Sequence, residues 1–169
     1  MGFLDKLLNL EGKEYLPALE DVSDSDIVAI ADGELVDIKT VSDPMFAEEM
    51  LGKSVAFRYQ KKTTLCSPAN GVMTVLFPTG HAFGVTTNEG VVLLVLCGVD
   101  TVNAKGNGFK ILKKQGDTVN AGDPIVQVDV PRLAETYDMS TILIVTTANE
   151  KEIDFIEPQT VKRGQSLLK

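Results

Sequence analysis

Short runs of β-branched and aliphatic residues, separated by Gly, Pro, Asn and Asp, constrain the fold of this chain more than any other feature. Such runs are typical of strands, and here the turn-forming residues recur roughly every 8 to 12 positions, as in small all-β domains. The runs predicted as strands are 27–30, 34–38, 54–59, 72–77, 91–97, 125–128 and 141–146. The pattern predicts an all-β fold, an antiparallel β-sandwich or barrel.

Helical signals are few. Asp43 and Pro44 have the character of an N-cap and a first helical residue, and one or two turns are expected to follow, ending near Leu51. Residues 131–137 form a second candidate. One or two short helices are therefore expected among the strands.

A faint internal repeat runs through the chain. Residues 31–36 resemble residues 69–74, and residues 118–123 resemble residues 160–165. In each pair a glycine able to adopt a positive φ introduces or closes a strand. The spacing predicts an internal pseudo-duplication of related β topology, with chance similarity of short strings as the alternative.

The chain divides into three parts. Residues 1–15 form an amphipathic N-terminal segment, residues 16–26 an acidic linker, and residues 27–169 one β domain. Residues 1–10 place apolar side chains on one helical face, which either contacts a membrane surface or a partner, or packs on its own domain. No signal peptide is visible, and the apolar run 91–97 is far shorter than the ~20 residues of a membrane span. A cytoplasmic location is expected, with peripheral contact at the inner membrane face as an open alternative.

Composition excludes several classes of function. The net charge is −8, from 16 basic and 24 acidic residues, and no basic run suggests nucleic-acid binding. One histidine and two cysteines are too few for a structural zinc site or a zinc peptidase, so no metal or cofactor is expected. A lipoyl or biotinyl carrier would need a lysine in a Met-Lys-type string, which is absent. Cys66 and Cys97 show no paired spacing and are predicted to be free, buried thiols.

Several strings carry a resemblance to a known family. They are residues 43–48, 79–83, 98–102, 106–109 and 116–123. Together they closely resemble the glucose-type enzyme IIA of the bacterial phosphoenolpyruvate-dependent sugar phosphotransferase system, in the same order and over nearly the whole chain. The start of the chain is similar to the amphipathic leader of enteric-type members. The resemblance implies a β-sandwich with a shallow apolar face on which two histidines meet.

The resemblance also implies a site and its partners. In the family, one histidine accepts a phosphoryl group from the phosphocarrier protein and passes it to the membrane sugar permease, enzyme IIB/IIC. It implies that His81 is the second, supporting histidine and that Thr79 hydrogen-bonds its ring. The implied partner-binding residues are two rim acids and three phenylalanines of an apolar collar: Asp43, Asp100, Phe46, Phe77 and Phe83. Regulated metabolic enzymes are further implied partners.

The phosphoacceptor position departs from the family. Where members have a string of the type Phe-Val-His-Phe-Gly, residues 94–98 are Leu-Val-Leu-Cys-Gly, which puts Leu96 at that position. Leucine has no lone pair, whereas the reaction depends on the nucleophilicity of an imidazole with a near-neutral pKa. The family reaction therefore cannot run as written, and whether the chain is an enzyme stays open.

Several explanations are compatible with Leu96. The protein is a phosphotransfer-deficient binding or regulatory member, or His81 has become the acceptor, or the sequence was altered in a laboratory. A scaffold outside the phosphotransferase system is a further alternative. Alternation along the strand sends Cys97 to the opposite face, so a thiolate replacement is not expected. The zinc that family members share between two histidines and a partner is expected to be weakened or absent.

Overall fold

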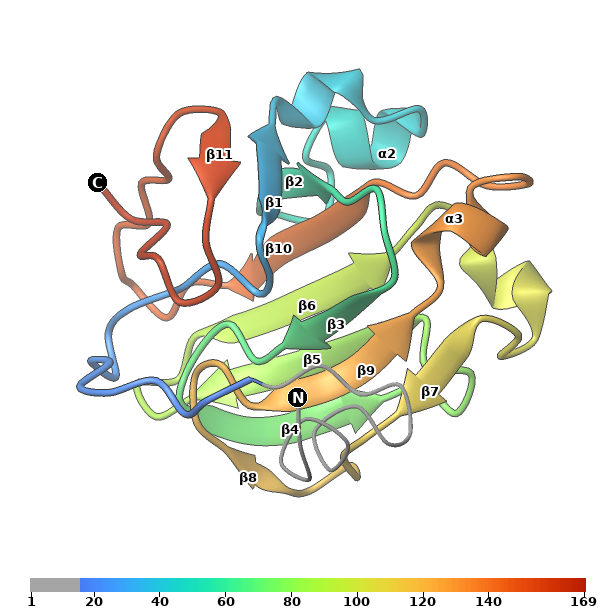
Figure 1. Ribbon diagram of the computed structural model, residues 1–169. Helices are drawn as coiled ribbons and strands as arrows, with labels where there is room; N and C mark the ends of the chain where they lie inside the picture. The colour runs from blue at the N-terminus through green and yellow to red at the C-terminus, as the bar shows by residue number, and fades with distance from the viewer. Residues whose placement is uncertain (1–15) are drawn as a thin grey trace.

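The computed structural model describes residues 16–169, and Figure 1 shows their arrangement. The strands are β1 (Gly33–Val36), β2 (Lys53–Arg58), β3 (Thr63–Cys66), β4 (Gly71–Leu76), β5 (Ala82–Thr87), β6 (Val92–Cys97), β7 (Phe109–Ile111), β8 (Thr118–Val119), β9 (Pro124–Val128), β10 (Thr141–Thr147) and β11 (Gln159–Val161). The helices are α2 (Pro44–Ala47) and α3 (Val130–Leu133), with 3-10 turns η1 (Ile38–Thr40) and η2 (Thr101–Ala104). The amphipathic segment predicted for residues 1–15, and its membrane contact through residues 1–10, lie outside the described residues.

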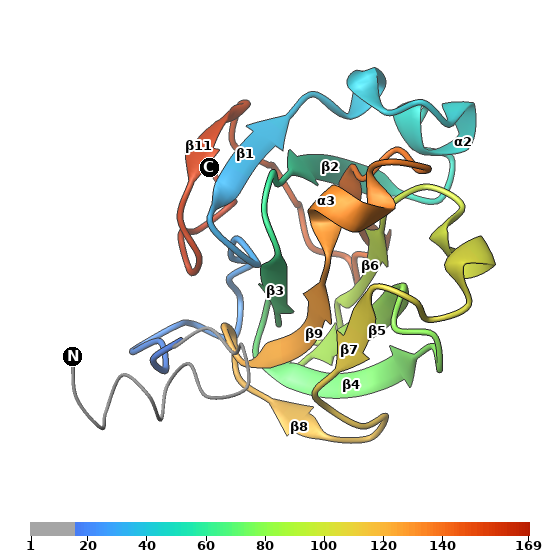
Figure 2. The same ribbon diagram turned by 45° about the vertical axis from the view of Figure 1, so that its right-hand side comes forward.

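The strands form two antiparallel sheets. The large sheet has the order β11-β1-β2-β10-β6-β5-β4-β8, and the small sheet has the order β3-β9-β7. The large sheet ends at β11 and β8 and does not close on itself, so the fold is a sandwich and not a barrel. The prediction of an all-β antiparallel fold with short helices is confirmed. Figure 2 shows the small sheet in front of the curved large sheet.

Two hydrophobic clusters lie on opposite faces of the large sheet. The main core fills the space between the sheets and includes Val95 of β6 and Val126 of β9. The smaller cluster covers the outer face and consists of Val41, Ala56, Val99, Ile142 and Ile144. We call this group the outer cluster. Alternation of side chains along β6 and β10 explains how the same strands contribute to both clusters.

The predicted pseudo-duplication is visible in the strand order. Read from its two ends, the large sheet runs β11-β1-β2-β10 and β8-β4-β5-β6, so β6 and β10 meet at the centre. Gly33 of β1 pairs with Val161 of β11, and Gly71 of β4 pairs with Val119 of β8. These four residues occupy matched positions of the sequence repeat, which therefore reflects two related halves.

The predicted linker, residues 16–26, packs on the matched turns of the two halves. A Cβ atom added to Gly122 or to Gly164 would lie 2.6 or 2.7 Å from the Leu19 side chain. The Arg163 guanidinium donates to the Gly122 carbonyl at 2.8 Å and links the two turns. Leu19 thus packs against one matched turn from each half. The division of the chain at residue 26 stays a prediction.

The predicted elements differ from the observed ones in specific places. Residues 27–30 form no strand, because Val28 N donates to Pro68 O and Ala29 N to Gln165 O, in two separate segments. The sequence did not predict β3, β5, β7, β8 and β11. Strands β7 and β8 are very short, and β3 is buried along its whole length, so neither length nor alternation marks them. The second predicted helix is shorter than expected and begins at Val130.

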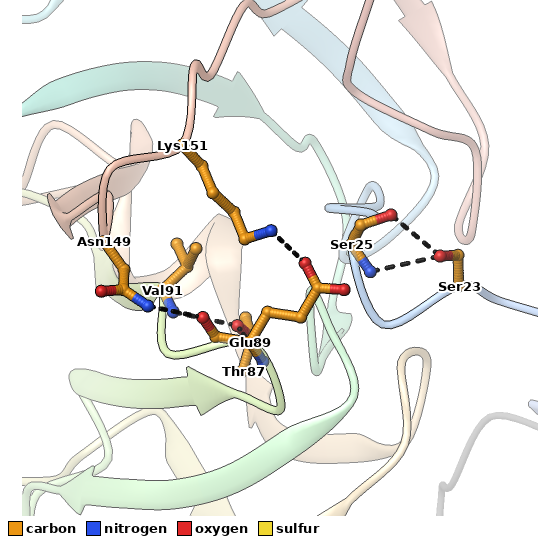
Figure 3. A network of polar contacts seen from close by, with 7 residues as sticks. All are labelled: Ser23, Ser25, Thr87, Glu89, Val91, Asn149 and Lys151. Carbon is orange, nitrogen blue, oxygen red and sulfur yellow. Dashed lines mark hydrogen bonds and ion pairs between the residues drawn. The ribbon is translucent and has the colours of Figure 1, made fainter.

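The turn between β5 and β6 is anchored by polar contacts (Figure 3). Glu89 forms an ion pair with Lys151, and Asn149 Nδ2 donates to the Glu89 carbonyl at 2.8 Å. Within the turn, Val91 N donates to Thr87 Oγ1 at 3.0 Å. These contacts tie one end of β5 and β6 to the segment after β10.

Among residues 16–169, no helix combines the length and the apolar character needed to cross a membrane.

Candidate functional site

A tight turn between β4 and β5 positions the candidate site. Gly80 has φ 78° and donates to the Phe77 carbonyl at 2.8 Å, while Phe77 N donates to the Ala82 carbonyl at 3.1 Å. A Cβ at Gly80 would lie 3.1 Å from Phe109 Cβ, so the turn also packs closely on β7. Glycine therefore suits this position for two reasons, its backbone conformation and the lack of space. The residues on either side, Thr79 and His81, are held in fixed positions.

The His81 ring is oriented by two neighbours. The Thr79 hydroxyl and His81 Nδ1 form a hydrogen bond, and the edge of the Phe77 ring contacts the imidazole at a centroid distance of 5.1 Å. Burial lowers the pKa of His81 below its ordinary value of 6.5. The imidazole is therefore neutral at pH 7, and Nε2 is the ring nitrogen left outside the hydrogen bond to Thr79.

Leu96 lies on the adjacent strand. Its Cα is paired with Ala82 of β5 on one side and with Ile142 of β10 on the other. The amide of the next residue, Cys97, donates to the His81 carbonyl at 2.8 Å, which places the backbones of β6 and the His81 turn side by side. The Leu96 side chain is half-buried against the outer cluster. The face thus presents an aliphatic side chain at the position where the family resemblance expects an imidazole.

Cys97 points to the other side of the sheet. Its side chain is fully buried in the main core, as the alternation of β6 predicts. Burial raises the pKa of the Cys97 thiol far above its ordinary value. A buried, protonated thiol is a poor nucleophile, so Cys97 is a poor candidate for a phosphoacceptor.

Most of the predicted rim residues lie on connections that flank this face. Asp43 caps α2 by accepting a hydrogen bond from Met45 N at 2.9 Å, and Pro44 is the first helical residue, as predicted. Phe46 of the same helix packs against the outer cluster, as Leu96 does. Asp100 is exposed directly after the end of β6 and adopts φ 62° before η2.

Phe83 is the one predicted collar residue that the structure does not bring to this face. It is fully buried in the main core, because its pairing partner on β6 is the inward-facing Val95. Besides Phe77, which is 42% exposed, the large exposed apolar residues on the connections that flank this face are ones that the sequence analysis did not select. They are Met45, Met50, Leu51 and Val102, which are 41–69% exposed. For Met45, Met50 and Leu51 the available signal was a group of large apolar residues around Glu48 and Glu49, in a segment where only Pro44–Ala47 is helical.

Asp138 is a second residue that the sequence analysis missed. Its carboxylate accepts hydrogen bonds from Ser42 N at 3.1 Å, from Ser140 N at 2.9 Å and from Ser140 Oγ at 2.7 Å. Burial acts to raise the pKa of Asp138, but the hydrogen bonds from Ser140 and Ser42 outweigh it and lower the pKa to about 2. Its carbonyl also accepts from Val99 N at 2.8 Å. Asp138 thus joins the loop before α2 to the loop after β6.

No metal centre is evident in the part of the chain that the structure describes. Within residues 16–169, no three His, Cys, Asp or Glu side chains gather where they could hold a metal ion.

Comparison with known proteins identifies the family. Residues 25–152 match the family described as phosphoenolpyruvate-dependent sugar phosphotransferase system, EIIA 1. The chain belongs to this EIIA family. The matched region contains the β4–β5 turn, β6, α2 and η2, and therefore every residue of the candidate site.

Relatives include proteins of similar and of much greater length. The glucose-specific EIIA component of Mycoplasma capricolum subsp. capricolum is 35% identical over 139 residues, which cover 82% of this chain and 90% of that protein. The glucose-specific EIICBA component of Staphylococcus carnosus is 34% identical over 137 residues, and the chain spans about a fifth (20%) of its length.

A solved structure supports the fold. The glucose permease IIA from Mycoplasma capricolum superposes with a TM-score of 0.80 at 33% sequence identity. The superposition covers 85% of this chain and 93% of that structure. The two proteins therefore share the sandwich architecture over nearly its full extent.

Proposed function

We propose that this protein is a phosphotransfer-deficient member of the EIIA family that binds partners and regulates them in a permanently unphosphorylated form. The observation that carries the proposal is Leu96, which lies between Ala82 and Ile142 on the face beside His81. An aliphatic side chain packed against an apolar cluster is favourable for folding, at roughly 25 cal/mol per Å² of apolar surface buried. The change thus removes the nucleophile without disturbing the sandwich.

No neighbouring group supplies an equivalent nucleophile. His81 is the only histidine of the chain, and its Nδ1 is engaged by Thr79. In the family resemblance it holds the position of the supporting ring, and no second imidazole is present to share the charge. Cys97 is buried on the opposite face.

The proposed partners are the phosphocarrier protein and the sugar permease, enzyme IIB/IIC, with regulated metabolic enzymes as a further class. The name of the Staphylococcus carnosus relative, a glucose-specific EIICBA component, supports the permease as a partner. The exposed side chains of Met45, Phe77 and Val102, together with Asp43 and Asp100, give the face an apolar centre and an acidic rim. This layout is typical of transient protein interfaces. A cytoplasmic location is part of the proposal.

Phosphorylation with purified components tests this proposal. The protein is incubated with labelled phosphoenolpyruvate, the upstream enzyme and the phosphocarrier protein, and acid-labile phosphohistidine is measured by mass spectrometry. We expect no label on the natural chain and stoichiometric label on Leu96→His, because His81 and Thr79 are already in place beside that position. Leu94→His is the matched control, since it adds an imidazole to the same face two residues away and is expected to stay unlabelled.

Three results would contradict the proposal. Label on the natural chain that disappears in His81→Asn would make His81 the acceptor. Failure of Leu96→His to accept label would show that the face has lost more than its nucleophile. Absence of binding when the phosphocarrier protein is titrated into the natural chain would favour a scaffold outside the phosphotransferase system.

A further inference from the structure

The small sheet carries a hollow on its outer face, away from the candidate site. Gln127 lies on the central strand of this sheet, β9. The strand register pairs it with Thr64 of β3 on one side and with Lys110 of β7 on the other. The neighbours of Gln127 along β9, Val126 and Val128, lie in the main core, so Gln127 faces outward. The hollow measures about 320 Å³. Figure 2 shows β3, β9 and β7 side by side below α3.

The walls of this hollow come from the ends of the same strands. Lys62, Lys110, Gln127 and Asp129 contribute polar side chains, and Gly108 contributes backbone without a side chain. Asp129 N donates to the Gly108 carbonyl at 2.8 Å, which closes the end of the sheet nearest α3. A volume of about 300 Å³ is at the lower end of the range for small-molecule sites.

The charge around the hollow is opposite to that of the molecule. The chain has a net charge of −8, yet residues 50–88 and 101–116 contain no Asp or Glu. These two segments supply β3 and β7 and carry a group of lysines: Lys61, Lys62, Lys105, Lys110, Lys113 and Lys114. Within residues 16–169, the only ion pair made by this group joins Lys62 to Asp129 at 3.9 Å. The lining of the hollow itself has two lysines, Lys62 and Lys110, and one aspartate, Asp129, so its net charge is +1 on a protein whose net charge is −8.

The side chains of the hollow specify the chemistry of a ligand. Two ammonium groups, on Lys62 and Lys110, match the charge of a phosphate monoester, which is close to −2 at pH 7. The Gln127 amide donates and accepts hydrogen bonds. The Asp129 carboxylate already caps α3 through Arg132 N and pairs with Lys62, and its remaining lone pairs can accept from a hydroxyl group. A ligand with phosphate alone would leave Asp129 opposed to its charge. We propose that this hollow binds a small phosphorylated polyhydroxy compound of the sugar monophosphate class.

This proposal goes beyond the function proposed for the Leu96 face and does not depend on it. The hollow lies at the small sheet, whereas Leu96 packs on the outer side of the large sheet. The two places share one contact, because Phe109, which lines the hollow, packs on the Gly80 turn. The neighbours of Gly80 on this side are Phe109, Ile111 and Val126, and not Lys110, so variants at Lys110 are expected to leave the face around His81 intact. Loss of one function and loss of the other are distinguishable in separate assays.

Calorimetric titration of the full chain with glucose 6-phosphate as the probe tests the proposal. We expect saturable binding with a Kd at or below about 1 mM, at least tenfold tighter than for inorganic phosphate, and no binding of glucose. Lys110→Gln is expected to weaken the binding by about tenfold or more, because it removes a charge-assisted hydrogen bond. Lys39→Gln is the matched control, as it makes the same charge change on an exposed residue of η1 and is expected to leave the Kd unchanged.

Each alternative result overturns the proposal in a specific way. Absence of saturable glucose 6-phosphate binding removes the site. Equal weakening by Lys110→Gln and Lys39→Gln shows unspecific charge attraction, and equal affinity for inorganic phosphate removes the role of Gln127 and Asp129. Binding to phosphatidylglycerol vesicles that is lost in Lys110→Gln, without glucose 6-phosphate binding, assigns the surface to lipid headgroups instead.

Discussion

The two halves of the large sheet differ in how their first hairpins are connected. In the first half, residues 37–52 connect β1 to β2 and include η1 and α2. In the second half, residues 77–81 connect β4 to β5 through the Gly80 turn. The long connection folds back over the outer face, where Val41 and Phe46 join the outer cluster. The short connection contributes no such cover.

This difference determines which part of the outer face stays open. Ile142 and Ile144 of β10 are fully buried, whereas their paired residues on β6, Leu96 and Leu94, are half-buried. The four side chains are similar in size and lie on the same face of the sheet. One half of the face is thus covered by the chain itself, and the other half, beside His81, stays half-exposed.

The largest expected effect comes from shortening one side chain on the covered part of the outer face, Ile142, and one on the open part, Leu94. Ile142→Ala should lower the free energy of unfolding by about 3 kcal/mol, because it leaves a cavity in a closed cluster. Leu94→Ala should lower it by roughly 1 kcal/mol, since a half-buried side chain loses less contact and its site is refilled by solvent. Denaturant unfolding at pH 7 measures both. Equal losses in the free energy of unfolding would show that the covered and the open parts of the outer face are equally packed, which would contradict the difference between them.

A smaller effect is expected from a substitution at Asp138, the residue that holds the β1–β2 connection in place over the covered part of the outer face. Asp138→Asn should lower the free energy of unfolding at pH 7 by about 1 kcal/mol, because a neutral amide accepts weaker hydrogen bonds from Ser42 and Ser140. Asp100→Asn is the matched control on the same side of the molecule. Its side chain makes no capping hydrogen bond, and asparagine tolerates its positive φ, so little change is expected.

The pH dependence of this pair of variants follows from the lowered pKa of Asp138. A carboxyl whose folded pKa is about 2, against an ordinary value of 3.8, stabilises the fold fully above pH 3.8. That contribution is lost as the pH falls from 3.8 through 2. The difference between the natural chain and Asp138→Asn should therefore shrink across this interval. A difference that stays constant down to pH 2 would contradict the assignment.

The smallest expected effect is the shift in the pKa of His81 on the open side. Because the chain has one histidine, a single imidazole proton resonance reports on it without ambiguity. Its NMR titration midpoint should lie below 6.5 in the folded protein and near 6.5 in denaturant, since burial disfavours the charged ring. The unfolded state then binds the proton more readily, so this contribution to stability is complete above pH 6.5 and declines below it. A folded midpoint at or above 6.5 would mean that the ring is more solvated than its contacts with Thr79 and Phe77 indicate.

The sequence predicted the local structure around individual site residues better than it predicted which distant residues come together at the site. The Asp43–Pro44 cap of α2 and the outward placement of Leu96 relative to Cys97 follow from local rules of capping and alternation. Phe83 was assigned to the collar because its string resembles the family, but the register of β5 against β6 turns it inward. Asp138 could not be found in this way, since it acts on Ser42, 96 residues earlier in the chain.

The sequence by itself predicted an antiparallel β protein and a repeat that either relates two halves or arises by chance, and it places a leucine, which is no nucleophile, at position 96. Each of these statements follows from the spacing or the type of residues along the chain. Only the tertiary structure decided that the fold is an open sandwich, that the outer face is covered over β10 and open over β6, and that lysines from two distant segments flank one hollow. Those features depend on contacts between residues far apart in the chain. Local sequence preferences are compatible with several arrangements, and packing and strand register determine which one forms.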